Sequence, residues 1–200
     1  MLFFLSAATG YILGSLNFGI ILTKLFYKKD IRNMGSGNAG ATNALRNFGI
    51  YFAILVFFFD MLKGFVAVYL TKMFAKGDQT LFLLTGVFAV IGHLYPVFFR
   101  FRGGKGVATT SGVMIAAEPI LAPYLFGMFI LISLVTRYVS LASICSVILY
   151  PILVYFFCGH SIEQTVFAAI LAVLVIFVHR QNIVRLVKGT ERKVSLKKKK

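Results

Sequence analysis

The residues best suited to chemistry lie in a glycine-rich stretch, 35–43, which reads GSGNAGATN and is soon followed by Arg46. Glycines allow backbone N–H groups to converge on a phosphate without obstruction by a Cβ atom. A helix that begins near Thr42 would add the partial positive charge of its N-terminus. The stretch therefore predicts an anion site made of Gly35, Ser36, Gly37, Asn38, Thr42, Asn43 and Arg46. The alternative is a flexible linker, which has no need of these polar side chains together.

A second glycine-rich stretch, 103–110, reads GGKGVATT and repeats this logic with Lys105 as the cation. Its threonines would open the next helix, so that a helix N-terminus again faces the bound anion. A basic turn that only sets membrane topology is the alternative. The candidate binding residues here are Gly103, Gly104, Lys105, Gly106 and Thr109.

A third polar segment, 179–186, reads HRQNIVRL and follows the last apolar run of the chain. His179 and Asn182 are three residues apart and share one helix face. A basic segment beside a membrane also binds lipid headgroups, at about 1 kcal/mol per residue, so Arg180 and Arg185 allow either role.

The elements that must position these groups are membrane spans. The chain has 200 residues, is 59% hydrophobic and carries a formal net charge of +15, with a mean hydropathy of +0.87. A soluble domain has an apolar content of about 45–50%. The basic residues lie between the apolar runs, where they set topology, so we expect no nucleic acid partner. The first apolar run lacks the basic start and cleavage site of a secretory signal.

The apolar runs predict an all-α, polytopic membrane protein, a single domain over residues 1–200 with a basic tail from 191. The expected spans are 1–23, 48–70, 81–99, 139–157 and 163–178, with 107–136 as either one span or two short ones. A break at Glu118-Pro119 would give seven helices and put all the basic loops on one side. We therefore expect about seven spans, two of them short, with the N-terminus outside and the C-terminus in the cytoplasm. One unbroken helix would give six.

Several smaller features lead to further expectations. Gly10 and Gly14 are four apart and would allow a neighbouring helix to approach closely. Asp60 and Lys63 share a helix face and favour an ion pair directed into the bundle, since a lone charge at mid-membrane costs about 2.5–3.5 kcal/mol. The two cysteines match no metal-site spacing, so we expect neither metal nor cofactor. The terminal Lys197–Lys200 is either a headgroup contact or a cloning remnant.

Taken together, these motifs resemble the bacterial acyl-phosphate:glycerol-3-phosphate acyltransferases of the PlsY type. The resemblance runs in order through nearly the whole chain. The stretches that carry it are Asp30–Arg32, Gly35–Arg46, Phe59-Asp60, Lys63-Gly64, Gly92-His93 with Pro96, Gly103–Thr109, and His179–Leu186 with Gly189 and Glu191.

The resemblance implies transfer of a fatty acyl group from acyl phosphate to the sn-1 hydroxyl of glycerol 3-phosphate. The products would be lysophosphatidic acid and phosphate, as an early step of phospholipid synthesis. The enzyme would lie in the bacterial inner membrane with its active site on the cytoplasmic side. Its partners would be the two substrates, membrane lipid and the upstream enzyme that forms acyl phosphate.

The expected catalytic residues are Ser36, Arg46, Lys105, His179 and Asn182, with Arg185 and the remaining polar and glycine residues above as substrate ligands. Three reaction routes are open. In the route that we favour, the donor phosphate accepts the proton of the attacking hydroxyl. In the second, His179 accepts that proton, and in the third, Ser36 first forms an acyl-enzyme. The rival class is a small anion transporter, which would hold charges near mid-span on broken helices.

Overall fold

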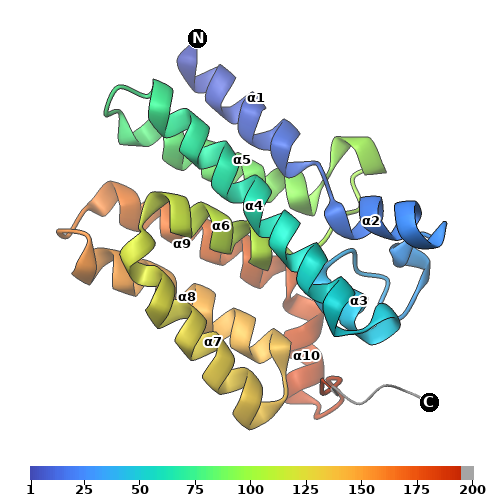
Figure 1. Ribbon diagram of the computed structural model, residues 1–200. Helices are drawn as coiled ribbons and strands as arrows, with labels where there is room; N and C mark the ends of the chain where they lie inside the picture. Colours follow the sequence, from blue (N-terminus) through green and yellow to red (C-terminus); the bar gives the residue numbers. More distant parts are fainter. Residues whose placement is uncertain (195–200) are drawn as a thin grey trace. The chain divides into compact units, whose positions relative to one another are not determined.

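The computed structural model describes residues 1–194, and all the regular secondary structure in this part of the chain is helical, with no strand (Figure 1). The expected all-α class is therefore confirmed. The lysines at 197–200 lie outside the described residues. The chain divides into two compact units, Met1–Ala117 and the part from Glu118 onward, and a single domain over the whole chain stays a prediction.

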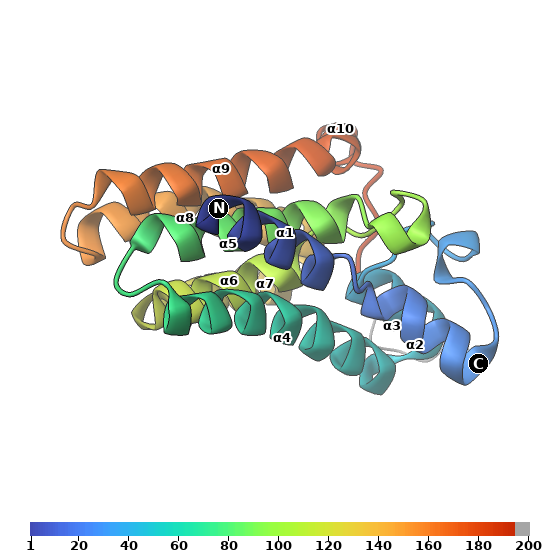
Figure 2. The same cartoon turned by 90° about the horizontal axis from the view of Figure 1, so that it is seen from above.

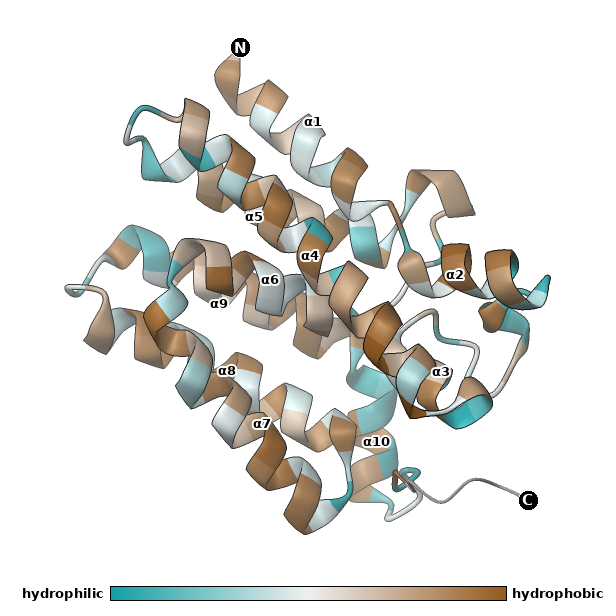
Figure 3. Ribbon diagram, in the orientation of Figure 1, coloured by the Kyte–Doolittle hydropathy of each residue, from teal (hydrophilic) through white to brown (hydrophobic). Residues whose placement is uncertain are grey.

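The first unit contains α1 (Leu2–Gly14), α2 (Phe18–Tyr27), η1 (Ile31–Asn33), α3 (Ala41–Phe48), α4 (Ile50–Phe74), α5 (Gln79–Leu94), η2 (Val97–Phe99) and α6 (Val107–Ala117). The second contains η3 (Pro119–Leu121), α7 (Ala122–Thr136), α8 (Val139–Phe157), α9 (Ile162–Val178) and α10 (Arg180–Val187). Figure 3 shows apolar residues along most of the long helices and polar residues gathered mainly near their ends.

The first apolar segment is not the unbroken span that its hydropathy predicts. It consists of α1 and α2, separated at residues 15–17. Asn17 explains the break, because its side-chain Oδ1 accepts a hydrogen bond of 3.2 Å from the N–H of Ile20 and so caps α2. Leu2–Tyr27 as a whole is still long and apolar enough to cross a membrane.

The ambiguous segment 107–136 forms two helices, α6 and α7, so the predicted break at Glu118-Pro119 is confirmed. Among residues 1–194, five helices or helix pairs are long and apolar enough to span a membrane, and the bent pair α9 and α10 makes a sixth. Helix α6 is shorter, with 11 residues. The total of seven spans and the sides on which the termini lie stay predictions.

Small residues bring the helices of the first unit into close contact. Helix α1 packs along α5, and α4 along both α5 and α6 (Figures 1 and 2). A Cβ atom at Gly14 of α1 would overlap the backbone of Ala89 in α5, and one at Gly10 would overlap Thr85. The predicted close approach at these glycines is confirmed. Gly64 of α4 faces Thr109 of α6 in the same way.

Asp60 and Lys63 form the expected ion pair, buried, with 2.8 Å between Lys63 Nζ and Asp60 Oδ1. The pair also satisfies the backbone where α1 and α2 separate. Lys63 Nζ donates to the carbonyl of Leu16 at 2.7 Å, and the N–H of Phe18 donates to Asp60 Oδ1 at 3.2 Å. The charges therefore serve as partners for backbone groups that a continuous helix would have paired internally.

In the second unit, α8 packs against both α7 and α9. Glu118, at the break between α6 and α7, is 4% exposed. Its Oε2 accepts a hydrogen bond of 2.7 Å from the hydroxyl of Tyr150 in α8. The glutamate at the helix break is thus buried and hydrogen-bonded to α8 within this unit.

We expect Gly64→Ala to destabilise the protein by about 1–3 kcal/mol, the usual cost of overpacking, because the new methyl group would overlap Thr109 O. Thermal unfolding in detergent measures this. The matched control is Gly127→Ala in α7, where nothing lies within 4 Å of the added carbon. Equal unfolding midpoints for the two variants would contradict the tight α4–α6 contact.

Candidate active site

The first glycine-rich loop is held from inside by Asn43. Helix α3 begins at Ala41, as the sequence predicts, and the Asn43 side chain points back under the loop with 1% exposure. Its Nδ2 donates to the carbonyls of Ile31, Met34 and Asn38 at 2.9–3.1 Å. Its Oδ1 accepts from the N–H of Ser36 at 3.0 Å. These bonds give Asn43 a structural task, and its predicted contact with substrate stays a prediction.

The remaining residues of this loop lie nearer the surface. Gly35 and Gly37 adopt φ values of 58° and 73°, which suit glycine, and both are exposed with Ser36 and Arg46. Asn38 and Thr42 are half-buried, and the Asn38 Oδ1 accepts from the N–H of Gly40 at 3.0 Å. The loop therefore presents a hydroxyl and a guanidinium on an ordered backbone.

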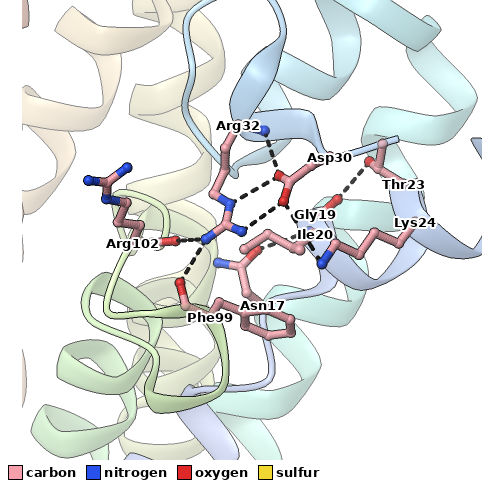
Figure 4. A network of polar contacts seen from close by, with 9 residues as sticks. All are labelled: Asn17, Gly19, Ile20, Thr23, Lys24, Asp30, Arg32, Phe99 and Arg102. Atoms are coloured by element: carbon pink, nitrogen blue, oxygen red, sulfur yellow. Dashed lines mark hydrogen bonds and ion pairs between the residues drawn. The ribbon is translucent and has the colours of Figure 1, made fainter. Parts of the chain in front are cut away.

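Arg32, just before the first loop, bonds to the segment that leads into the second loop (Figure 4). Its guanidinium makes a two-point contact with Asp30, with Nε–Oδ1 and Nη2–Oδ2 distances of 3.0 and 2.7 Å. Its Nη1 donates to the carbonyls of Phe99 at 2.7 Å and Arg102 at 3.3 Å. The hydrogen bonds from Arg32 lower the pKa of Asp30 below its ordinary value. Our site prediction left this pair out, although both residues belong to the stretch 30–32 that carries the resemblance.

The second loop is seated on the end of α5. The N–H groups of Gly103 and Gly104 donate to the carbonyls of Leu94 and His93 at 3.2 and 3.1 Å. These two N–H groups are therefore engaged within the fold, contrary to the expectation that Gly104 offers its own to a phosphate. Gly106, with φ of 80°, turns the chain into α6, whose first N–H groups lack partners within the helix.

Lys105 is half-buried between these glycines, directly before α6 begins. Thr109, the last candidate of the second loop, is fully buried against Gly64. It therefore supports the start of α6 from within the unit, and a direct contact with substrate stays a prediction.

In the second unit, α9 and α10 meet at His179 with a bend of 61°. His179 is 2% exposed, and its Nδ1 lies 2.7 Å from the carbonyl of Val175. Since a carbonyl only accepts hydrogen bonds, Nδ1 carries the proton and Nε2 is the basic nitrogen of the neutral ring. The carbonyl of Val175 therefore fixes the tautomer and the orientation of this ring.

Glu191 holds the other predicted residues of this segment. Its Oε1 accepts from Asn182 Nδ2 at 2.7 Å and from Ser140 Oγ at 2.8 Å, and its Oε2 accepts from Arg185 Nε at 2.7 Å. Burial alone would raise the pKa of Glu191, but the hydrogen bonds from Arg185, Asn182 and Ser140 outweigh it, and the pKa is lowered. Glu191 was not among the site candidates. The sequence did offer one signal for it, since Glu191 is an acidic residue within a strongly basic segment.

The first two loops thus lie in one unit, where Arg32 joins the segments that precede them, while His179, Asn182 and Arg185 belong to the second unit. Among residues 1–194, no group of three or more His, Cys, Asp or Glu side chains is able to hold a metal ion.

Comparison with known proteins agrees over nearly the full length. The sequence profile of the family described as glycerol-3-phosphate acyltransferase matches residues 4–189. A glycerol-3-phosphate acyltransferase of Staphylococcus carnosus is 43% identical over 97% of this chain and 98% of its own. One of Aquifex aeolicus is 44% identical over 90% of this chain and 93% of its own.

Two solved structures match as well. Both are crystal structures of PlsY, an integral membrane glycerol 3-phosphate acyltransferase. Its glycerol 3-phosphate form has a TM-score of 0.90 at 41% identity, covering 96% of each chain. Its lysophosphatidic acid form has a TM-score of 0.88 at 40% identity, covering 97% of this chain and 96% of the other.

The helices and the matches define a multi-pass integral membrane acyltransferase. The chain belongs to the glycerol-3-phosphate acyltransferase family of the PlsY type.

We expect Glu191→Gln to lower the thermal unfolding midpoint at pH 7, because the neutral amide weakens the contacts to Arg185 and Asn182. The folded pKa of Glu191 lies below its ordinary value. Its ionised form therefore stabilises the fold above the ordinary glutamate pKa of about 4.3, and this stabilisation is lost as pH falls through the lowered pKa. The gap between variant and wild type should narrow as the pH falls below about 4.3.

The control is Glu163→Gln, which removes the same charge from an exposed glutamate in the first turn of α9. We expect a smaller shift there. A Glu191→Gln protein as stable as wild type at pH 7 would contradict the assigned network.

Proposed function

We propose that this protein transfers a fatty acyl group from acyl phosphate to the sn-1 hydroxyl of glycerol 3-phosphate. The products are lysophosphatidic acid and inorganic phosphate, so the protein acts in phospholipid synthesis. The observation that carries this proposal is the bonding of Arg32, just before the first glycine-rich loop, to the segment just before the second, since Arg46 and Lys105 lie beside or within these loops. Relatives named for glycerol 3-phosphate supply the acceptor. The relative crystallised in a lysophosphatidic acid form supports the product.

The chemistry suits a site without a strong base. Acyl phosphate is a mixed anhydride with a good leaving group. The acceptor hydroxyl attacks the carbonyl carbon, a C–O bond to the acceptor forms, and the C–O bond to the donor phosphate breaks. Catalysis then consists mainly of orientation and stabilisation of charge.

Two phosphates must approach each other, which their like charges oppose. We assign Lys105 and Arg46 to offset this repulsion, as a lysine and an arginine are suited to phosphate. Ser36, Asn38 and Thr42 orient the phosphate and glycerol oxygens. The N-terminus of α6, which follows Gly106, adds backbone N–H donors. His179 and Asn182 act on the acceptor.

The proton of the attacking hydroxyl passes to the donor phosphate, which leaves with the electron pair of the broken C–O bond. His179 is the alternative base. Its Nδ1–H is fixed on Val175 O, which leaves Nε2 as the basic nitrogen. A Ser36 acyl-enzyme is the third route, and Ser36 is exposed.

We also propose that the protein lies in the bacterial inner membrane with the three polar segments on the cytoplasmic side. Their basic residues follow the bias of cytoplasmic loops. The upstream enzyme that forms acyl phosphate is then a partner, since acyl phosphate is an amphiphile that need not leave the membrane.

We expect Lys105→Ala and Arg46→Ala to reduce kcat/KM by about 10²-fold or more, the usual loss for one donor to a developing charge, while both variants still fold. The assay follows phosphate release by purified protein in detergent from acyl phosphate and glycerol 3-phosphate. Lys76→Ala, which removes the same charge from an exposed turn between α4 and α5, is the control. Near-normal turnover in either site variant would discredit the site. Wild-type activity without a sealed compartment would also exclude transport as the primary role.

We expect no labelled protein when radiolabelled acyl phosphate is supplied without acceptor, because direct transfer forms no acyl-enzyme. Initial rates at varied concentrations of both substrates should give intersecting double-reciprocal lines. Stable label on wild type that disappears in Ser36→Ala, together with parallel lines, would establish the acyl-enzyme route instead.

A further inference from the structure

His93 is a buried histidine near the end of α5, with 3% exposure, and the proposed reaction does not use it. Its Nδ1 lies 2.9 Å from Lys63 Nζ. A lysine ammonium has three hydrogen atoms to donate. Those of Lys63 meet three acceptors, which are Asp60 Oδ1, Leu16 O and His93 Nδ1. An ammonium nitrogen cannot accept a hydrogen bond, so Nδ1, which also lies 3.5 Å from Asp60 Oδ1, accepts from Lys63, and the neutral ring carries its proton on Nε2.

The Nε2 side of this ring faces the second glycine-rich loop. A Cβ atom added to Gly104 would overlap His93 Nε2 and lie 2.9 Å from Cε1 of the same ring. The carbonyl of His93 also accepts from the N–H of Gly104 at 3.1 Å. The backbone of Gly104 is thus in contact with both the main chain and the side chain of one residue.

The position of Gly104 has a direct consequence for the cation of the loop. Lys105 follows it immediately, and α6 begins two residues later. The ring itself is held by the ion pair that closes the break between α1 and α2. A continuous series of contacts therefore leads from Asp60 through Lys63, His93 and Gly104 to Lys105.

We propose that His93 is a positioning residue: its ring, oriented by Lys63 and Asp60, sets the position of Gly104 and thereby aims Lys105 and the start of α6 at the substrate phosphate. The inference rests on the proposed function, which assigns Lys105 to that phosphate. His93 itself touches no substrate. A misplacement of about 1 Å at a catalytic group can cost about 10²-fold in rate. Loss of the imidazole ring that contacts Gly104 should therefore lower the rate by shifting Lys105.

A role in core filling alone makes a different prediction. It implies that substitutions at His93 lower stability while the protein that remains folded keeps its kinetic constants. A positioning role implies that folded variants lose kcat or gain KM for glycerol 3-phosphate, because Lys105 no longer meets its anion.

The first test compares two substitutions of His93. In His93→Asn, the side-chain Oδ1 still accepts from Lys63, but the ring edge that supports Gly104 is lost. In His93→Gln, the longer amide reaches towards the Nε2 position. We expect His93→Asn to lose at least about tenfold in kcat/KM and His93→Gln to keep more. The control is His160→Asn, an exposed turn histidine with φ of 57°, a conformation that asparagine accepts. Its kinetic constants should be unchanged.

The second test is a double-mutant cycle. Gly104→Ala should lose activity because the new methyl group displaces the loop from the ring. The double variant His93→Asn/Gly104→Ala makes room for that methyl group and should recover activity relative to Gly104→Ala alone. Independent, additive effects at these neighbouring residues would count against a shared contact.

Hydrogen exchange of the 100–110 backbone, followed by mass spectrometry, gives a readout that does not need turnover. We expect faster exchange in His93→Asn at Gly103 and Gly104, whose N–H groups bond to the end of α5.

A folded His93→Asn protein with wild-type kinetic constants and wild-type exchange would overturn the inference. A wild type without acyltransferase activity would overturn the proposed function instead, and the exchange would still decide whether His93 supports the loop. Should His93→Asn fail to fold, Gly104→Ala alone decides: contact with the ring predicts a loss of kcat/KM together with faster exchange at residues 103 and 104, and wild-type values of both would overturn the inference.

Discussion

The ammonium group of Lys63 is the point on which the first unit depends. It lies in an apolar bundle, where a lone charge is costly, and each of its three hydrogen atoms has an acceptor. Those acceptors come from the break between α1 and α2, from α4 and from α5. Breaking one member of such a buried group leaves an uncompensated charge. The ion pair thus compensates for the interruption between α1 and α2, because it bonds to backbone groups left unpaired there. It also joins three segments that are distant in sequence.

The order of the two glycine-rich loops rests on further contacts within this unit. Glycines allow α1 to approach α5 and α4 to approach α6, and the N–H groups of Gly103 and Gly104 bond to the end of α5. Arg32 joins the segments that precede the two loops through the carbonyls of Phe99 and Arg102, and the side chain of Asn43 bonds to the backbone of the first loop and of the segment before it. Much of the polar chemistry in this region is therefore devoted to holding backbone. Such preorganisation suits a transfer in which orientation and charge stabilisation do most of the work.

In the second unit, polar groups likewise hold one another in place at the bend between α9 and α10. A backbone carbonyl sets the tautomer of His179, and one carboxylate, Glu191, holds Asn182, Arg185 and Ser140. The carboxylate orients an amide and a guanidinium, and the carbonyl of Val175 orients His179.

The sequence by itself determined the all-α membrane class, the break at Glu118-Pro119, the start of a helix near Thr42 and the Asp60–Lys63 pair, because apolar run length and helical spacing are local properties. The motifs likewise led to the family. Only the tertiary structure decided that the first span is broken, that Asn43 turns inward, that Glu191 gathers Asn182 and Arg185, and that His93 stands against Gly104. An amide, a carboxylate or an imidazole has the same bonding capacity wherever it lies. Its partner is set by the backbone and side-chain groups that the folded chain brings near it, and helical spacing contains no record of them.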